Sequence, residues 1–158
     1  MSPGKRWLGR REVLALAGIL GALFLALQLL PVGAARDNPP VVAEPEWDSP
    51  RTRELFLRTC GDCHSNRTRW PWYSRVAPVS WLVAHDVAGG REHLNVSEWH
   101  REQRHAEEAA EELRGGEMPL PTYLRMHPEA RLSPAERDEL LQGLVATFGE
   151  RRRGERRR

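Results

Sequence analysis

Residues 60–64 form the short motif that most constrains what this chain can fold into. The motif reads Cys60-Gly61-Asp62-Cys63-His64: two cysteines separated by two residues, with a histidine directly after the second. At this spacing two thiols can form thioethers with the vinyl groups of a c-type haem, and the adjacent imidazole can bind the iron as proximal ligand. The motif therefore predicts one covalent haem c, attached through Cys60 and Cys63, with its iron bound by His64.

Two other kinds of site also use paired cysteines, and both stay open as alternatives. A thioredoxin-like dithiol lies beside a strand of a parallel sheet, but no stretch of this sequence has a β-rich pattern. A structural zinc site needs two further ligands at regular spacing, and the histidines downstream of the motif form no recognisable ligand pair. We expect these histidines at the surface or in the core: His85, His93, His100 and His105.

Residues 13–30 are almost purely apolar and read VLALAGILGALFLALQLL. Eighteen helical residues span about 27 Å, close to the ~30 Å thickness of the hydrocarbon core of a bilayer. Basic residues between positions 5 and 11 precede this run, so the positive-inside rule places residues 1–12 in the cytoplasm. We therefore expect a single-pass anchor in the cytoplasmic (inner) membrane, with the following chain in the periplasm or outside. The alternative is a cleaved signal peptide, because Val32-Gly33-Ala34 resembles a cleavage site.

The chain after the apolar run divides into three parts. Residues 31–50 are rich in proline and predict an extended, semi-rigid linker, in which we expect Trp47 to pack on the domain. Residues 51–149 form the predicted haem-binding domain, and residues 150–158 form an arginine-rich, disordered tail. Between residues 36 and 149 there are 14 basic and 19 acidic residues. This balance argues against a nucleic-acid partner, which would need a basic folded face.

Helix signals at both ends of residues 51–149 predict an all-α domain. Ser49 followed by Pro50 is typical of an N-cap and a first helical position, so we expect a helix that runs into the haem motif. Ser133 and Glu136 form a capping box that starts the last helix, and Gly149 ends it. We expect the last helix to pack on the first, as in a small cytochrome c-like domain folded around one covalent haem.

Two more helices are expected between these ends. One covers residues 78–88 and ends at the glycine pair 89–90. Asn95 predicts the N-cap of the other, with Glu98 reaching back to complete a capping box. The glycine pair 115–116 is expected to end this second helix.

Residues 65–83 contain an unusually aromatic loop that has to pack against something. We expect its four aromatic residues to form a wall of the haem pocket, with plain core packing as the alternative. Three arginines in this region either pair with the haem propionates or are solvated: Arg67, Arg69 and Arg75. The aromatic residues are Trp70, Trp72, Tyr73 and Trp81.

The second axial ligand is expected downstream, in the stretch that reads EMPLP at residues 117–121. A thioether opposite an imidazole fills the sixth position of the iron and raises its reduction potential. We expect Met118 in this role, although a methionine also serves as a gap-filling core residue. Met126 and His127 are the reserve candidates, and His127 would give a bis-imidazole site of lower potential.

Several stretches resemble the bacterial haem-binding domain family, a membrane-anchored group related to c-type cytochromes. The resemblance covers roughly residues 38–148. It implies one covalent haem attached at Cys60 and Cys63, with His64 as axial ligand, and the family's methionine-proline element falls on Met118. It implies no substrate. The matching stretches are CGDCHSN at 60–66, WPWYS at 70–74, APVSWL at 77–82, LNVSEW at 94–99, GEMPL at 116–120 and HPEARLS at 127–133.

Three functions follow, in order of preference. The first is a membrane-anchored, periplasmic electron carrier with a haem ligated by His64 and Met118, which exchanges electrons with redox partner proteins of the membrane or periplasm. The second is a haem-based sensor or small-gas-binding module with a displaceable sixth ligand. The third is a peroxidase-like enzyme that uses His127 as distal acid-base group. We expect no enzymatic activity, because the sequence shows no other catalytic grouping.

Overall fold

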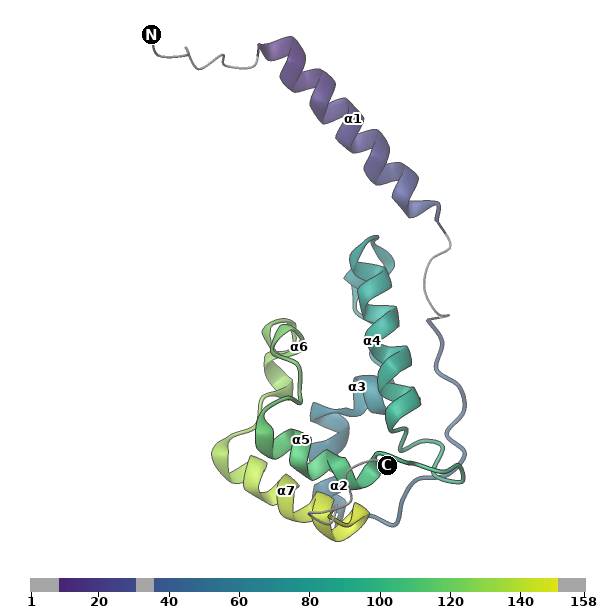
Figure 1. The fold of residues 1–158 in the computed structure, drawn as a ribbon, viewed down its shortest axis with the longest axis vertical. Coiled ribbons are helices and arrows are strands. Elements are labelled where there is room, and N and C mark those ends of the chain that lie inside the picture. Colours follow the sequence, from purple (N-terminus) through teal and green to yellow (C-terminus); the bar gives the residue numbers. More distant parts are fainter. Residues whose placement is uncertain (1–8, 31–35, 151–158) are drawn as a thin grey trace, which may run out of the picture.

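The structure, a computed structural model, describes residues 9–30 and 36–150. The predictions for the basic N-terminus before residue 9, for the cleavage-like site at residues 31–35 and for the tail after residue 150 lie outside the described residues. Within the described ranges the chain is helical and forms no strand, apart from an isolated parallel bridge between Ala43 and Glu98. The predicted all-α class is confirmed for this part of the chain (Figure 1).

Helix α1, Arg10–Gln28, stands apart from the other helices (Figure 1). None of its residues is buried, and the helix is long and apolar enough to cross a membrane. Its last residue contacts the domain: the Gln28 side chain donates to the Ala77 carbonyl (3.2 Å) and accepts from the Ala77 N–H (2.9 Å). One polar side chain at the end of an apolar helix thus joins that helix to a loop of the domain.

The first and last helices of the domain begin as the sequence predicts. In α2, Pro50–Thr59, the Ser49 hydroxyl accepts from the Thr52 N–H at 3.1 Å. In α7, Pro134–Phe148, the Ser133 hydroxyl accepts from the Glu136 N–H at 3.2 Å, and the Glu136 carboxylate accepts from the Ser133 N–H at 3.0 Å. Both caps satisfy N–H groups that a helix start leaves without a partner.

Helices α2 and α7 pack against each other, as predicted, and form the centre of the core. Phe56 is 1 % exposed, and its ring lies edge-on to that of Phe148 with 6.0 Å between centroids. The helices approach closely at Gly143, where an added Cβ would lie 2.8 Å from the Cβ of Thr52. The close approach explains why a glycine lies in the middle of α7 despite its low helix propensity.

Helix α4, Val79–His93, continues through Gly89 and Gly90, so the predicted end at this pair is wrong. Gly90 faces the short helix α3, Gly61–His64, and a Cβ on it would lie 2.6 Å from the Cys63 carbonyl oxygen. The glycine therefore serves helix packing rather than termination. The 3₁₀ turn η1, Trp72–Arg75, comes before α4 in the chain and packs on it.

The predicted helix start at Asn95 is also wrong, because residues 94–105 contain no helix. The Asn95 side chain accepts from the Ser97 N–H (3.0 Å) and donates to the Asn66 side chain (2.8 Å). An asparagine that bonds to the backbone two residues on forms a turn instead of a helix cap. The helical segment starts later, with the 3₁₀ turn η2, Ala106–Glu108, and α5, Ala109–Gly115.

Helix α5 ends at the glycine pair as predicted, since Gly116 has a φ of 78°, in the left-handed region that favours glycine. Helix α6, Pro121–Met126, and the 3₁₀ turn η3, Pro128–Ala130, then lead to α7.

Residues 36–49 form no helix and no strand apart from the bridge at Ala43, and they contact the domain. The Trp47 ring packs 5.3 Å from Phe56 and 5.6 Å from Phe148, which confirms the expected contact. The Glu44 carboxylate accepts two hydrogen bonds from Arg53 at 2.6 and 2.8 Å. These bonds are the main reason why the pKa of Glu44 is lowered to about 2. The segment is thus held on the domain by both apolar and charged contacts.

Candidate functional site

A cavity of about 490 Å³ lies among helices α2, α3, α4, α5 and α7 and the segment between α5 and α6. This volume falls within the ~300–1,000 Å³ that is usual for ligand and cofactor sites. Apolar side chains make up most of its walls, as cofactor pockets require. Those apolar side chains include Phe56, Leu94, Ala109, Leu113, Leu120 and Leu144.

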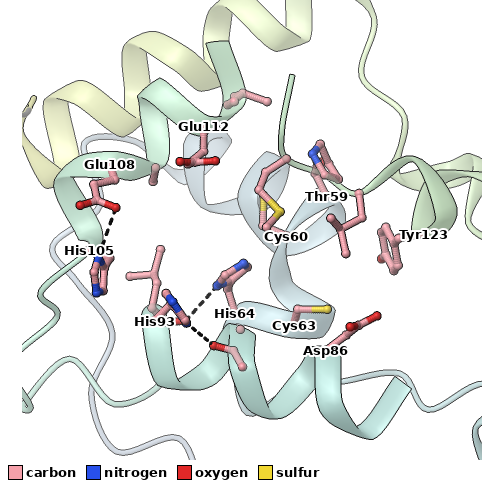
Figure 2. Close-up of a pocket in the computed structure, with 18 of the residues that line it drawn as sticks. Thr59, Cys60, Cys63, His64, Asp86, His93, His105, Glu108, Glu112 and Tyr123 are labelled. Atoms are coloured by element: carbon pink, nitrogen blue, oxygen red, sulfur yellow. Dashed lines mark hydrogen bonds and ion pairs between the residues drawn. The ribbon is translucent and has the colours of Figure 1, made fainter. Parts of the chain in front are cut away.

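The haem motif lines this cavity. Helix α2 ends directly before Cys60, and the single turn α3 carries Cys63 and His64, so Cys60, Cys63 and His64 all reach the same space (Figure 2). The turn is closed by the His64 N–H, which donates to the Cys60 carbonyl at 2.9 Å. The two thiols are free and partly exposed. One helical turn therefore presents both sulfurs and the imidazole to one cavity.

The pKa values of the two thiols are raised, in the direction opposite to that of a catalytic dithiol. Burial raises the pKa of Cys60 to about 12, and burial together with the Asp62 charge raises the pKa of Cys63 to about 11. Catalytic dithiols need the opposite shift, because the thiolate is the reactive form. The described residues also contain no strand, and hence not the sheet beside which a thioredoxin-like motif lies.

The His64 ring is oriented by the backbone that follows α4. Its Nδ1 lies 3.1 Å from the Leu94 carbonyl oxygen, and the His64 carbonyl accepts from the Val96 N–H at 3.0 Å. When Nδ1–H donates to a carbonyl, Nε2 carries the lone pair that can bind a metal. Burial lowers the pKa of His64, which favours the neutral form that metal binding requires.

Of the three candidates for a second axial ligand, the structure brings only Met118 to the cavity. Met126 is 57 % exposed and lies outside the lining. His127 also lies outside the lining; its ring stacks on that of Tyr123, a residue of the lining, with 4.2 Å between centroids.

Three of the histidines expected at the surface or in the core also line the cavity: His85 and His93, which are exposed as expected, and the half-buried His105. The rings of His93 and His105 lie 5.1 Å apart, and His105 Nδ1 lies 3.2 Å from a Glu108 carboxylate oxygen (Figure 2). His100 is exposed, as expected. His85, Gly89 and His93 are spaced four residues apart and therefore lie on one face of α4. A prediction that ends the helix before Gly89 cannot show that the two histidines share this face.

The aromatic loop does not form a wall of the cavity, and this expectation is wrong. Trp72 is 77 % exposed, and Trp70 Nε1 donates to Asn38 Oδ1 at 3.3 Å on the outside of the domain. The walls come instead from α4, α5 and the segment after α5. None of the four aromatic residues is among the residues that line the cavity: Trp70, Trp72, Tyr73 and Trp81.

The arginines of this loop likewise lie outside the cavity lining. Arg67 bonds to the Glu44 carboxylate at 2.9 Å, and Arg69 pairs with Asp62 at 3.2 Å. Arg75 is exposed. Two of the three arginines proposed for the propionates therefore have protein carboxylates as partners.

Asp62, inside the haem motif, is a structural residue that sequence reasoning missed. Its side chain is 8 % exposed; it accepts from the Arg69 N–H at 2.9 Å and from the Tyr123 hydroxyl at 2.8 Å. Burial, followed by the Asp62 charge, raises the pKa of Tyr123. The carboxylate thus ties α3 to α6, whose Tyr123 lines the cavity.

The fold and the cavity together indicate the class of protein, a small helical haem-binding protein. Two cysteines and an oriented histidine face a largely apolar cavity that also holds a methionine, and these residues fit a haem. The sequence profile of a family described as haem-binding domain matches residues 22–146, and this chain belongs to that family. The resemblance seen in the sequence is thereby confirmed. Neither a curated protein nor a solved structure matches the chain significantly.

Proposed function

We propose that this protein is a membrane-anchored c-type haem protein that transfers electrons. In this proposal Cys60 and Cys63 hold the haem through thioethers, and His64 and Met118 are the axial ligands. The observation that carries the proposal is that these four residues line a single cavity, although Met118 comes from a distant part of the sequence. The family match supports the cofactor.

The chain's own residues would position the cofactor and shield it from water. The Leu94 carbonyl fixes the His64 ring, and apolar walls that include Phe56 and Leu144 lower the local polarity. A bound haem supplies reversible one-electron exchange, and the protein sets its potential through axial ligands, burial and nearby charge. With both axial positions filled, no substrate needs to bind the iron, which suits a carrier.

The location we propose is the cytoplasmic membrane, with the domain in the periplasm. Helix α1 is fully apolar along its centre and has no buried residue, and Arg10 and Arg11 mark its cytoplasmic end by the positive-inside rule. This topology agrees with covalent haem attachment, which occurs outside the bacterial cytoplasm. The redox partners would then be proteins of the membrane or periplasm.

A gas-binding sensor is the second candidate, and one feature of the cavity favours it. Polar side chains line the cavity: His93 on α4, His105 just before η2 and Glu112 on α5 (Figure 2). Met118 lines it as well. Such polar groups can donate hydrogen bonds to, or polarise, a small molecule if the methionine leaves its position. Carbon monoxide distinguishes the two functions, because a carrier whose methionine stays bound reacts slowly and a sensor reacts rapidly.

The test begins with attachment of the cofactor. The full chain is produced with a haem c maturation system, and the denatured protein is stained for haem on a gel. We expect covalent haem in the unchanged chain and none in the Cys60→Ser/Cys63→Ser double variant. Voltammetry of the purified protein in detergent should then show a reversible one-electron wave that carbon monoxide leaves unchanged. Loss of all haem from the unchanged chain on denaturation would refute covalent attachment, and rapid binding of carbon monoxide would favour the sensor.

A further inference from the structure

The domain carries exposed apolar side chains at the end where α4 begins. Trp72 in η1 is 77 % exposed, and Val79 and Leu82 on α4 are 44 % and 58 % exposed. Val79 and Leu82 are three residues apart and therefore lie on the same side of the helix. We call Trp72, Val79 and Leu82 the apolar patch. Exposed apolar groups gathered at one end of a domain mark a surface that binds something.

Gln28 and Arg36, which lie before and after residues 31–35, both bond to the loop between Trp72 and Val79. Gln28, at the end of α1, makes two hydrogen bonds with Ala77, and the Arg36 guanidinium donates to the Ser74 carbonyl. Ser74 and Ala77 lie between Trp72 and Val79 in the sequence. Even without these bonds, the eight steps from residue 28 to residue 36 reach at most about 28 Å. The patch is therefore held close to the end of α1.

We propose that the apolar patch rests in the headgroup region of the same bilayer that α1 spans. This inference rests on the membrane anchoring in the proposed function. Tryptophan favours the boundary between water and hydrocarbon, where its ring is buried and its N–H stays hydrated. The exposed Arg75 beside Trp72 adds attraction to anionic headgroups. Figure 1 shows the start of α4 as the part of the domain nearest to α1.

Contact between the apolar patch and the bilayer would fix the orientation in which the domain meets its partners. A domain on a free spacer samples many orientations, whereas one held by α1, by the bonds to Ser74 and Ala77, and by the patch has a fixed face toward the lipid. Electron exchange would then occur with partners at the membrane surface.

The experiment measures the reaction of introduced cysteines with maleimides in the full-length, haem-loaded protein. The protein is reconstituted in vesicles of phosphatidylethanolamine and phosphatidylglycerol. Trp72→Cys and Leu82→Cys are compared with Gln142→Cys, a control on the exposed side of α7. Each variant reacts once with a charged maleimide and once with an apolar one, and the ratio of the two rates corrects for the intrinsic reactivity of each thiol.

We expect the charged reagent to react several-fold more slowly, relative to the apolar reagent, at positions 72 and 82 than at position 142. Equal ratios at all three positions would overturn the proposal. Protection that grows with the ratio of protein to lipid would assign the patch to a second copy of the chain and would also overturn it.

The design separates this inference from the proposed function. The unchanged chain should not react with either maleimide, because Cys60 and Cys63 are thioethers in the proposed protein; labelling of these residues would mean that covalent attachment fails, whatever the result at the patch. Release of the protein by an alkaline wash of the vesicles would overturn the anchoring and the patch together, while the haem content stays a separate measurement.

Discussion

The contact between Gly90 and the haem motif gives the sharpest prediction for the site. A Cβ added at Gly90 would lie 2.6 Å from the Cys63 carbonyl oxygen and 2.9 Å from the Cys63 Cβ. Ordinary contacts of this kind begin near 3.4 Å, so α4 must move away from α3 by about 0.8 Å to accommodate the methyl group, as overpacked sites do. The obstacle is backbone and cannot rotate away. Because Leu94 at the end of α4 orients His64, the displacement should reach the imidazole.

The neighbouring Gly89 provides a matched control, because a Cβ there meets nothing within 4 Å. Replacing a glycine inside a helix with alanine gains about 1 kcal/mol when space is free. Overpacking at a tight contact costs about 1–3 kcal/mol. Gly90→Ala should therefore be less stable than Gly89→Ala by about 1–3 kcal/mol, the size of the overpacking penalty alone, because both variants share the helix gain.

The assay is urea denaturation of the full-length protein in detergent, together with an absorption spectrum of each variant. Gly90→Ala should lower the free energy of unfolding relative to Gly89→Ala and change the haem spectrum or the yield of haem attachment. Gly89→Ala should equal or exceed the unchanged protein in stability; because Gly89 also lines the cavity, it serves as a control for stability and not for the spectrum. Equal stability of the two variants would refute the close packing of α4 on the motif.

Three further predictions concern the core and the segment that precedes it. Gly143→Ala places a methyl group 2.5 Å from Thr52 Cγ2 and should cost about 1–3 kcal/mol in urea denaturation; Thr52→Ala should recover part of this loss, and additive effects of the two changes would contradict the contact. Phe56→Ala empties a site that is 1 % exposed and should cost about 3–5 kcal/mol, measured in the same way. The lowered pKa of Glu44, about 2 beside Arg53 against 4.5 unfolded, adds stability above about pH 4.5 that is lost as the pH falls toward 2. Glu44→Gln should therefore be less stable than the unchanged protein near neutral pH and approach its stability below pH 4.5; a constant difference would refute the pairing.

The sequence predicts those parts of the fold that depend on local chemistry. Ser49 and Ser133 cap their helices because each precedes a proline and a helical run, and a hydroxyl at that place has few other uses. Gly116 ends its helix because only its backbone tolerates a positive φ at low cost. The spacing of the two cysteines and the histidine predicts that they face one site, and all three line the cavity.

The errors occur where tertiary contacts decide the role of a residue. Asn95 has a capping sequence, but its side chain accepts from the Ser97 N–H and donates to Asn66, which is distant in the chain. These two bonds hold Asn95 in a turn. The glycine pair predicts a helix end at Gly90, whereas the missing side chain of Gly90 allows the Cys63 backbone to pack closely against α4. The sequence prediction ends the helix before His93, so it does not place His93 at the cavity. The need of aromatic side chains for burial predicts Trp72 in a pocket wall, but Trp72 is 77 % exposed.

The central claim is that His64 and Met118 hold one haem iron from opposite sides, and an absorption spectrum tests it most directly. Oxidised and reduced spectra are recorded for the unchanged protein, for Met118→Ala and for Met126→Ala, whose methionine is exposed and outside the cavity. We predict a low-spin haem with the far-red band of iron–thioether ligation in the unchanged protein and in Met126→Ala, and loss of this band in Met118→Ala with haem still attached. A low-spin spectrum that Met118→Ala leaves unchanged, or a high-spin spectrum of the unchanged protein, would contradict the claim.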